Sequence, residues 1–206
     1  MRESMLALVA VTLGTSWLTV GCASQPSRFY LLSALPSTEM STPVASGQPG
    51  LTIGVGPVVL PRYLDRPQIA TRTSAYELKL AEFERWAEPL DANFTRVVAE
   101  NLATLIPSAR VTPFPWPRAT PIDHQVLVEV THFLSQMGGE SLLTADWTLL
   151  KGEGPQILAM GKSRVSVPTS GQDYTSIVAA MSQTVAELSR EIAAATKGLG
   201  PRTSKR

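Results

Sequence analysis

Residues 122–167 (IDHQVLVEVTHFLSQMGGESLLTADWTLLKGEGPQILAMGKSRVSV) decide the fold. Apolar and polar residues alternate in three runs of this stretch, for example where Leu143, Ala145 and Trp147 alternate with polar neighbours. Alternation with period two is typical of strands that bury one face. Glycines lie between the runs, at 138–139 and 152–154, where tight turns need them. The pattern predicts three consecutive antiparallel strands.

Two segments outside this core have the spacing of amphipathic helices. Between Pro89 and Pro107, apolar residues recur every three or four positions, and proline favours the first turn of a helix and stops it beyond the last. Between Ser170 and Gly198 the same spacing recurs, and Ser170-x-x-Asp173 resembles a capping box. Each helix therefore has one apolar face to lay on a sheet.

Further strands are predicted on the N-terminal side. Leu51 to Leu60 places Leu51, Ile53, Val55 and Val59 on one face, and its glycines suggest a bulge. Extended runs are also expected at 28–32, 68–72, 75–80 and 83–86, with a turn at Thr73-Ser74. The sequence thus predicts a layered α/β (α+β) domain with a mixed, largely antiparallel sheet of about five to seven strands and two amphipathic helices packed on one face.

The first 21 residues predict a cleaved export signal. Arg2 supplies a positive charge, and the uncharged run at 5–20 is shorter than the roughly 20 residues that span a bilayer. Residues 19–22 (TVGC) resemble a lipobox, so Cys22 is predicted to carry diacylglycerol and an amide-linked acyl chain. Ordinary cleavage near Cys22 is the alternative. Cys22 is the only cysteine, and lipidation consumes its thiol; Ala23 after it points, by resemblance to sorted lipoproteins, to the outer membrane.

Composition restricts the class of protein. Lys and Arg number 18 against 17 Asp and Glu, so no basic surface for nucleic acid is expected. We divide the chain into a signal peptide at 1–21, an anchor with a short strand and a Pro/Ser/Thr-rich linker at 22–50, a globular α/β domain at 51–198 and a flexible basic tail at 199–206.

No catalytic constellation is found in the sequence, so an enzyme is not expected. Nucleophile elbows, phosphate-binding loops and zinc-protease motifs are absent. His124 and His132 lie in one predicted strand, about 26 Å apart at 3.3 Å per residue, which is too far for joint metal ligation. Neither a metal nor a cofactor beyond the lipid at Cys22 is therefore predicted.

Two segments combine charged and aromatic residues. The first runs from Pro61 to Ile69 and contains a proline-bounded turn, and the second runs from Glu84 to Leu90. Such residues anchor protein interfaces, and they also form local ion-pair and aromatic locks between a hairpin and a helix. Both interpretations stay open, and the candidate partner-binding residues are Arg62, Tyr63, Asp65, Arg66, Arg85, Trp86 and Glu88.

These two segments also carry a family resemblance. Residues 59–69 (VLPRYLDRPQI), 85–90 (RWAEPL) and 97–102 (VVAENL) resemble the PqiC-type (YmbA-like) membrane-integrity lipoproteins, auxiliary lipoproteins of ABC-type transport. Phe29-Tyr30-Leu31-Leu32 looks like the family's opening strand. The resemblance spans about residues 22–194.

The resemblance implies an accessory role in transport between two membranes. It implies a periplasmic subunit tethered to the outer membrane, working with an MCE-domain protein and its inner-membrane partner, and assembled in a ring. The competing hypothesis is a lipid-binding carrier, which requires a cavity between helices and sheet lined by Phe94, Val98, Trp147 and Met181. Ordinary core packing also accounts for those four residues.

Overall fold

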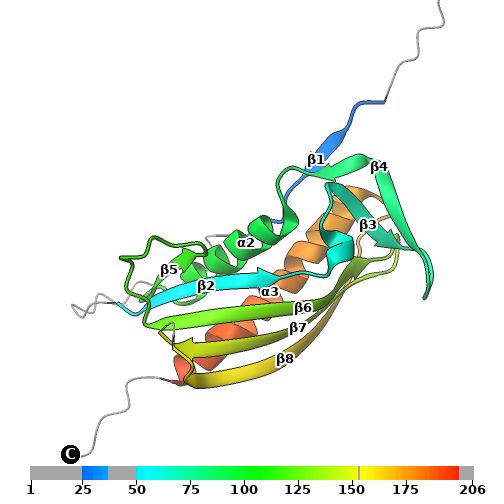
Figure 1. Cartoon of the computed structure of the whole chain (residues 1–206). Coiled ribbons are helices and arrows are strands. Elements are labelled where there is room, and N and C mark those ends of the chain that lie inside the picture. The colour runs from blue at the N-terminus through cyan, green and yellow to red at the C-terminus, as the bar shows by residue number, and fades with distance from the viewer. Residues whose placement is uncertain (1–24, 37–49, 153, 200–206) are drawn as a thin grey trace, which may run out of the picture.

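The computed structural model describes residues 25–36, 50–152 and 154–199 (Figure 1). The predicted signal peptide, Cys22, most of the predicted linker and the tail from residue 200 lie outside the described residues. A single sheet of eight strands and two long helices make up the described part. The strands are β1 (Arg28–Tyr30), β2 (Thr52–Val59), β3 (Gln68–Arg72), β4 (Leu78–Trp86), β5 (Arg110–Pro113), β6 (His124–Ser135), β7 (Glu140–Lys151) and β8 (Ile157–Pro168); the helices are the 3-10 turn η2 (Arg62–Leu64), α2 (Leu90–Leu105) and α3 (Tyr174–Gly198).

The predicted meander is confirmed. Strands β6, β7 and β8 pair antiparallel along nearly their whole lengths. Gly138 and Gly152 take positive φ angles of 64° and 59° in the two turns, a conformation that other residues rarely adopt. These long ladders form one side of the sheet, with β8 at its edge.

Beyond β6 the sheet divides into two branches. Strand β2 pairs in parallel with the first half of β6 and, along its other edge, with β5. Strand β3 pairs with β6 only at the C-terminal end of β6, through Thr71 and Ser135. On its other edge β3 pairs with β4, and β4 pairs in turn with β1. The fork between the branches is bridged by η2, and Figure 1 shows β2 and β3 leaving it in different directions.

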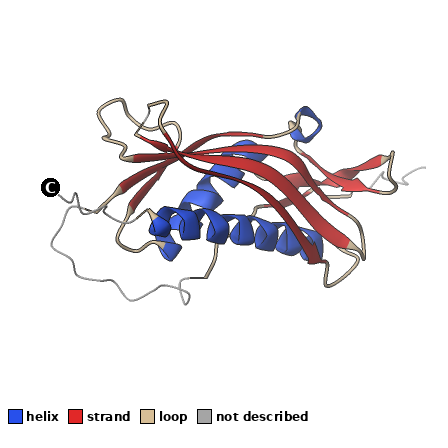
Figure 2. Cartoon of the chain, turned by 90° about the horizontal axis from the view of Figure 1, so that it is seen from below, coloured by secondary structure: helices blue, strands red, loops and turns tan. Residues whose placement is uncertain are grey.

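Both helices cover the same face of the sheet, as predicted (Figure 2). Helix α2 packs on β2 and β5, α3 packs on β6, β7 and β8, and the two helices contact each other. Phe94 of α2 meets Phe133 of β6 edge to face, with ring centroids 5.4 Å apart. Each such buried side chain stabilises the fold by about 1.5–3 kcal/mol.

The expected strand count of five to seven was too low. The runs at 75–80 and 83–86 form one strand, β4, and the turn before it is longer than Thr73-Ser74, since Thr73 N donates to Glu77 O at 3.1 Å. Strand β5 was not predicted, because its four residues run into a proline-rich segment and it forms only by pairing with β2.

Two local predictions were wrong. Val59 was expected to share the buried face of Ile53 and Val55 but is 55% exposed, because a register shift between Val55 and Val58 reverses the alternation. Ser170 does not cap α3. Asp173 is the N-cap, and its carboxylate accepts from Ser176 N at 2.8 Å.

Candidate docking site

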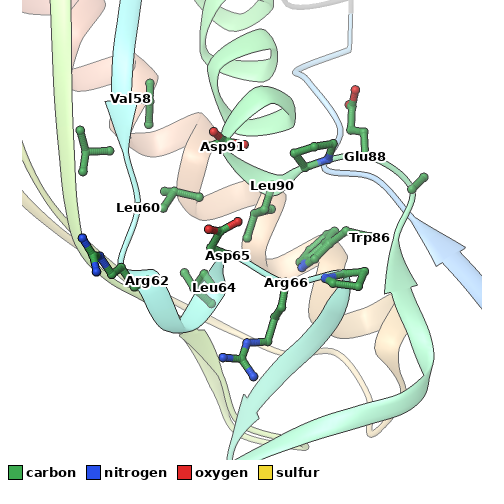
Figure 3. Close-up of a pocket in the computed structure, with 14 residues that line it drawn as sticks. Val58, Leu60, Arg62, Leu64, Asp65, Arg66, Trp86, Glu88, Leu90 and Asp91 are labelled. Atoms are coloured by element: carbon green, nitrogen blue, oxygen red, sulfur yellow. The ribbon is translucent and has the colours of Figure 1, made fainter.

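A surface hollow of about 620 Å³ lies in the fork of the sheet. Its walls come from the end of β2, the turn η2, the end of β4 and the start of α2, so four elements converge there (Figure 3). We call it the fork hollow. Its lining residues are Val58, Val59, Leu60, Arg62, Leu64, Asp65, Arg66, Pro67, Trp86, Ala87, Glu88, Pro89, Leu90 and Asp91.

The structure brings most of the predicted partner-binding residues together. Arg62, Asp65, Arg66, Trp86 and Glu88 all line the fork hollow, although the two segments that carry them are about 20 residues apart in sequence. Figure 3 shows Asp65, Leu90 and Trp86 directed toward one another, with the guanidinium groups of Arg62 and Arg66 extending outward. The two segments therefore form one site.

Tyr63 and Arg85 were predicted in the site but do not line the hollow. Tyr63 is half-buried against the core and hydrogen-bonds with the backbone of Phe133; burial is the main reason that the pKa of its phenol is raised. Arg85 is half-buried, and its Nε has no hydrogen-bond partner among the described residues. In strand β4 it points to the opposite side from its neighbour Trp86.

The floor of the hollow is a tight turn held by prolines. Leu64 N donates to Pro61 O at 2.9 Å, and Asp65 N donates to Arg62 O at 3.1 Å. Leu64 is 4% exposed, so its side chain anchors the turn in the core. On the far side Trp86 N donates to Pro67 O at 2.7 Å, which joins the turn to β4. Prolines fix φ and reduce the freedom that ordering this segment would otherwise remove.

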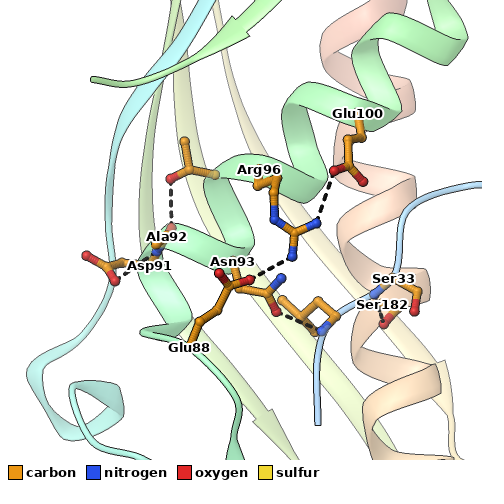
Figure 4. A network of polar contacts seen from close by, with 10 residues as sticks. Ser33, Glu88, Asp91, Ala92, Asn93, Arg96, Glu100 and Ser182 are labelled. Atoms are coloured by element: carbon orange, nitrogen blue, oxygen red, sulfur yellow. Dashed lines mark hydrogen bonds and ion pairs between the residues drawn. The ribbon is translucent and has the colours of Figure 1, made fainter. Parts of the chain in front are cut away.

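The charged residues of the hollow divide between the two predicted roles. Glu88 accepts from Arg96 of α2 at 2.6 Å, and Arg96 also donates to Glu100 at 3.0 Å (Figure 4). The hydrogen bond with Glu88 is the first cause of the raised pKa of Arg96. Glu88 thus forms a local ion pair with α2. Its contribution to stability is reduced by solvent, because both partners are more than one-third exposed.

Arg62, Asp65 and Arg66 behave differently. All three are exposed, and within residues 25–36, 50–152 and 154–199 none of them forms an ion pair. Their charges surround a wall of Leu60, Leu64, Trp86 and Leu90. An apolar centre with a polar rim is the usual composition of a protein-binding surface.

Residues that the sequence analysis missed hold the N-terminal segment beside this site. Asn93 of α2 accepts from Leu32 N at 2.7 Å, and Asn101 accepts from Leu35 N at 2.7 Å and donates to Ser189 of α3 at 3.2 Å. Ser33 N donates to Ser182 of α3 at 3.1 Å (Figure 4). The sequence did contain a sign of these contacts. Asparagine normally disfavours a helix interior, so an asparagine within the apolar stripe of a helix indicates that its side chain has a specific partner.

Neither a metal centre nor a membrane-spanning helix is found in the part of the chain that the structure describes. Among the described residues no group of three or more His, Cys, Asp or Glu side chains is placed to hold a metal ion. Burial lowers the pKa of His124 and of His132. Within the same residues, no helix combines the length and the apolar character needed to cross a bilayer.

A family model described as the ABC-type transport auxiliary lipoprotein component matches residues 30–193, which include every element of the fork hollow. The chain belongs to this family. Its relatives include the intermembrane transport lipoprotein PqiC of Escherichia coli (strain K12), which is 28% identical over 141 residues, covering 68% of this chain and 72% of PqiC. PqiC of Shigella flexneri matches equally. The resemblance inferred from the sequence is thereby confirmed.

Solved structures support the fold of this auxiliary lipoprotein. A protein of Xanthomonas campestris superposes with a TM-score of 0.67 at 18% identity, covering 87% of this chain and 100% of that protein. A second, uncharacterized protein gives a TM-score of 0.66 at 20% identity, covering 82% and 98%. The family's description as a lipoprotein agrees with lipidation of Cys22, which lies outside the described residues and stays a prediction.

Proposed function

We propose that this auxiliary lipoprotein docks an MCE-domain protein at the periplasmic face of the outer membrane, in a system that moves hydrophobic molecules between two membranes. The fork hollow is the docking surface. The convergence of the two charged and aromatic segments on one hollow carries the proposal. Membership of a transport auxiliary family and likeness to an intermembrane transport lipoprotein support it.

The chemistry of the hollow indicates how such a partner binds. Trp86 and Leu90 are 5% and 3% exposed, so they form the packed apolar back of the hollow, and Val59, which is 55% exposed, provides accessible apolar surface in front of it. A volume of about 620 Å³ accommodates one or two inserted side chains. Interfaces obtain most of their affinity from a few such central contacts. The unpaired charges of Arg62, Asp65 and Arg66 then select a partner whose rim carries matching charges. Binding at this surface requires no chemical step.

Site-specific crosslinking in cells tests the proposal. A photo-crosslinking amino acid at position 66, at the rim of the hollow, should trap an MCE-domain protein that mass spectrometry identifies. The same amino acid at position 118, an exposed position that does not line the hollow, is the matched control. The mass of the trapped assembly also gives the copy number and so tests the predicted ring.

A charge-reversal pair provides the second arm. Arg62→Glu with Arg66→Glu should reduce recovery of the partner about tenfold or more, because reversed rim charges oppose association. Arg118→Glu should leave recovery unchanged. Trapping of the MCE-domain protein from position 118 and not from position 66 would refute the fork hollow as the docking surface.

The carrier alternative has lost its main support. Phe94, Val98 and Met181 are at most 1% exposed and Trp147 is 8% exposed. All four belong to the packed core, and none lines the fork hollow. Their burial is accounted for by ordinary packing between helices and sheet.

A further inference from the structure

A polar pocket and an apolar groove meet where β1 passes the first turns of α3. The polar pocket, of about 670 Å³, is lined by Arg28, Tyr30, Glu84, Met137 and residues 172–176. The groove, of about 480 Å³, lies between residues 29–36 and α3. Tyr30 and Thr175 line both, so the two form one continuous site that shares no lining residue with the fork hollow.

A buried carboxylate lies in the polar pocket. Glu84 is 6% exposed, and its Oε1 pairs with Arg28 Nη2 at 3.0 Å. Its Oε2 is buried and has no hydrogen-bond partner among the described residues. A buried charged oxygen left without a partner costs free energy, which a ligand that donates a hydrogen bond recovers.

Aromatic rings flank this carboxylate. Tyr30 and Tyr174 lie with ring centroids 6.4 Å apart and planes inclined at 49°. Burial is the main cause that raises the pKa of the Tyr30 phenol, so the ring stays neutral. Tyrosine faces beside a carboxylate attract an ammonium group through both cation–π and ionic interactions. With Asp173 also in the lining, acidic groups outnumber the single cation Arg28.

Arg28 supplies the second half of a charge match. Its side chain is 65% exposed whereas that of Glu84 is 8% exposed, so Arg28 leaves the buried carboxylate only when an ammonium group takes its place. The released guanidinium remains at the rim of the pocket, where its planar fork suits a phosphate. A ligand with both an ammonium and a phosphate group thus exchanges one ion pair for two.

The groove continues from this charged end as an apolar channel. Its α3 side carries small residues, among them Ala179, Ser182 and Ala186, and its other side includes Phe29 and Leu31. Phe29 is 65% exposed and Leu31 is 45% exposed, so the described chain leaves this apolar surface uncovered. An acyl chain attached to the headgroup would cover it.

We propose that this site binds one zwitterionic glycerophospholipid. The ammonium group contacts Glu84 beside the Tyr30–Tyr174 pair, the phosphate contacts Arg28, and one acyl chain lies in the groove along α3. This proposal goes beyond docking and does not depend on it. Only the source of the lipid rests on the predicted anchor: Cys22 precedes Arg28 by six residues, which reach roughly 20 Å, so an anchored domain holds the site near the bilayer.

Native mass spectrometry of the full-length protein, purified from membranes in detergent, tests the site. With added dioleoylphosphatidylethanolamine, the protein should retain one lipid, and with dioleoylphosphatidylglycerol, which lacks the ammonium group, occupancy should be about tenfold lower. Glu84→Gln should reduce binding of the phosphatidylethanolamine about tenfold as well. Free phosphoethanolamine should bind far more weakly, since it cannot use the groove.

Ala179→Trp fills the groove from an exposed position of α3 and should also reduce retention about tenfold. Ala194→Trp, at another exposed position of the same helix, is the matched control and should change nothing. If Glu84→Gln fails to fold, the pair of tryptophan variants still decides the question. Equal retention of both lipids, equal binding of free phosphoethanolamine, or full retention by Ala179→Trp would overturn the proposal. Crosslinking from position 66 tests docking at the fork hollow, and lipid retention tests the site beside β1. The two measurements are independent, so either proposal can fail while the other stands.

Discussion

Trp147 of β7 lies opposite Gly161 of β8, and its Nε1 donates to Ser163 Oγ at 3.1 Å. A Cβ atom at position 161 would lie 2.4 Å from Trp147 Cζ2, which is inside van der Waals contact. The indole thus occupies space that every residue except glycine would need. Side-chain packing of this kind is invisible in the alternation that predicted the strand, because the alternation gives a face and no partner.

Gly161→Ala should therefore lower the free energy of unfolding by about 1–3 kcal/mol, the usual cost of overpacking a core. Urea denaturation followed by far-UV circular dichroism measures the change. Gly198→Ala is the control, because a Cβ there meets nothing within 4 Å. Equal stability of wild type and Gly161→Ala would show that Trp147 moves aside freely.

Residue types predicted the candidate site better than residue directions did. Of the seven residues predicted to bind a partner, five line the fork hollow. Tyr63 and Arg85 do not line it, because the mixture of types in a segment does not say which side chains share a side. For Arg85 the answer was available in principle, since neighbours in a strand face opposite ways. For Tyr63 it depends on the turn η2.

At the scale of elements, α3 begins one turn of sequence later than the capping pattern indicated. Asp173 supplies the N-cap contact to Ser176 N. Both Ser170 and Asp173 are residues that cap helices well, so composition alone does not choose between them. In the structure β8 ends at Pro168 and the N-cap of α3 is Asp173.

Asp173→Ala should lower the free energy of unfolding by about 0.5–2 kcal/mol through loss of the cap, whereas Ser170→Ala should stay within about 0.5 kcal/mol of wild type. Thermal denaturation of both variants side by side is sufficient. A larger effect at position 170 would restore the capping box read from the sequence.

Long, strongly periodic elements were predicted well, and short ones were not. The meander and both helices bury a continuous stripe, so their periodicity is strong. Strand β5 has four residues, and β1 has three, so pairing rather than pattern defines them. The bulge in β2 was foreseen from its glycines, yet its effect on Val59 was not, because a register shift changes the face of every later residue.

For the whole molecule, the fork in the sheet was beyond prediction from the sequence. It arises because β2 and β3 occupy different parts of one edge of β6, with β3 held there by the Thr71–Ser135 pair. Such long-range parallel pairing leaves no local trace in the chain. The fork hollow exists because of this arrangement, so its shape could not be predicted from the sequence.

The predicted anchor determines how the whole molecule is held. Cells grown with a clickable palmitate analogue should label the wild-type protein and not Cys22→Ser, because Cys22 is the only cysteine that can be modified. Membrane fractionation should show the same difference, since two or more acyl chains give stable attachment. Unlabelled wild-type protein, or equal labelling of Cys22→Ser, would contradict lipidation at this residue.

The bonds that Asn93, Asn101 and Ser182 make to the backbone of residues 32–35 also have a mechanical meaning. Tension applied at the N-terminus reaches the three-residue strand β1 first and the bond to Leu32 next. The pulling force would therefore break these hydrogen bonds one after another, while the long β6–β7 and β7–β8 ladders would not carry it. With the predicted anchor in place, the resistance of this segment to a pulling force would be set by a few side-chain amides and hydroxyls on two helices.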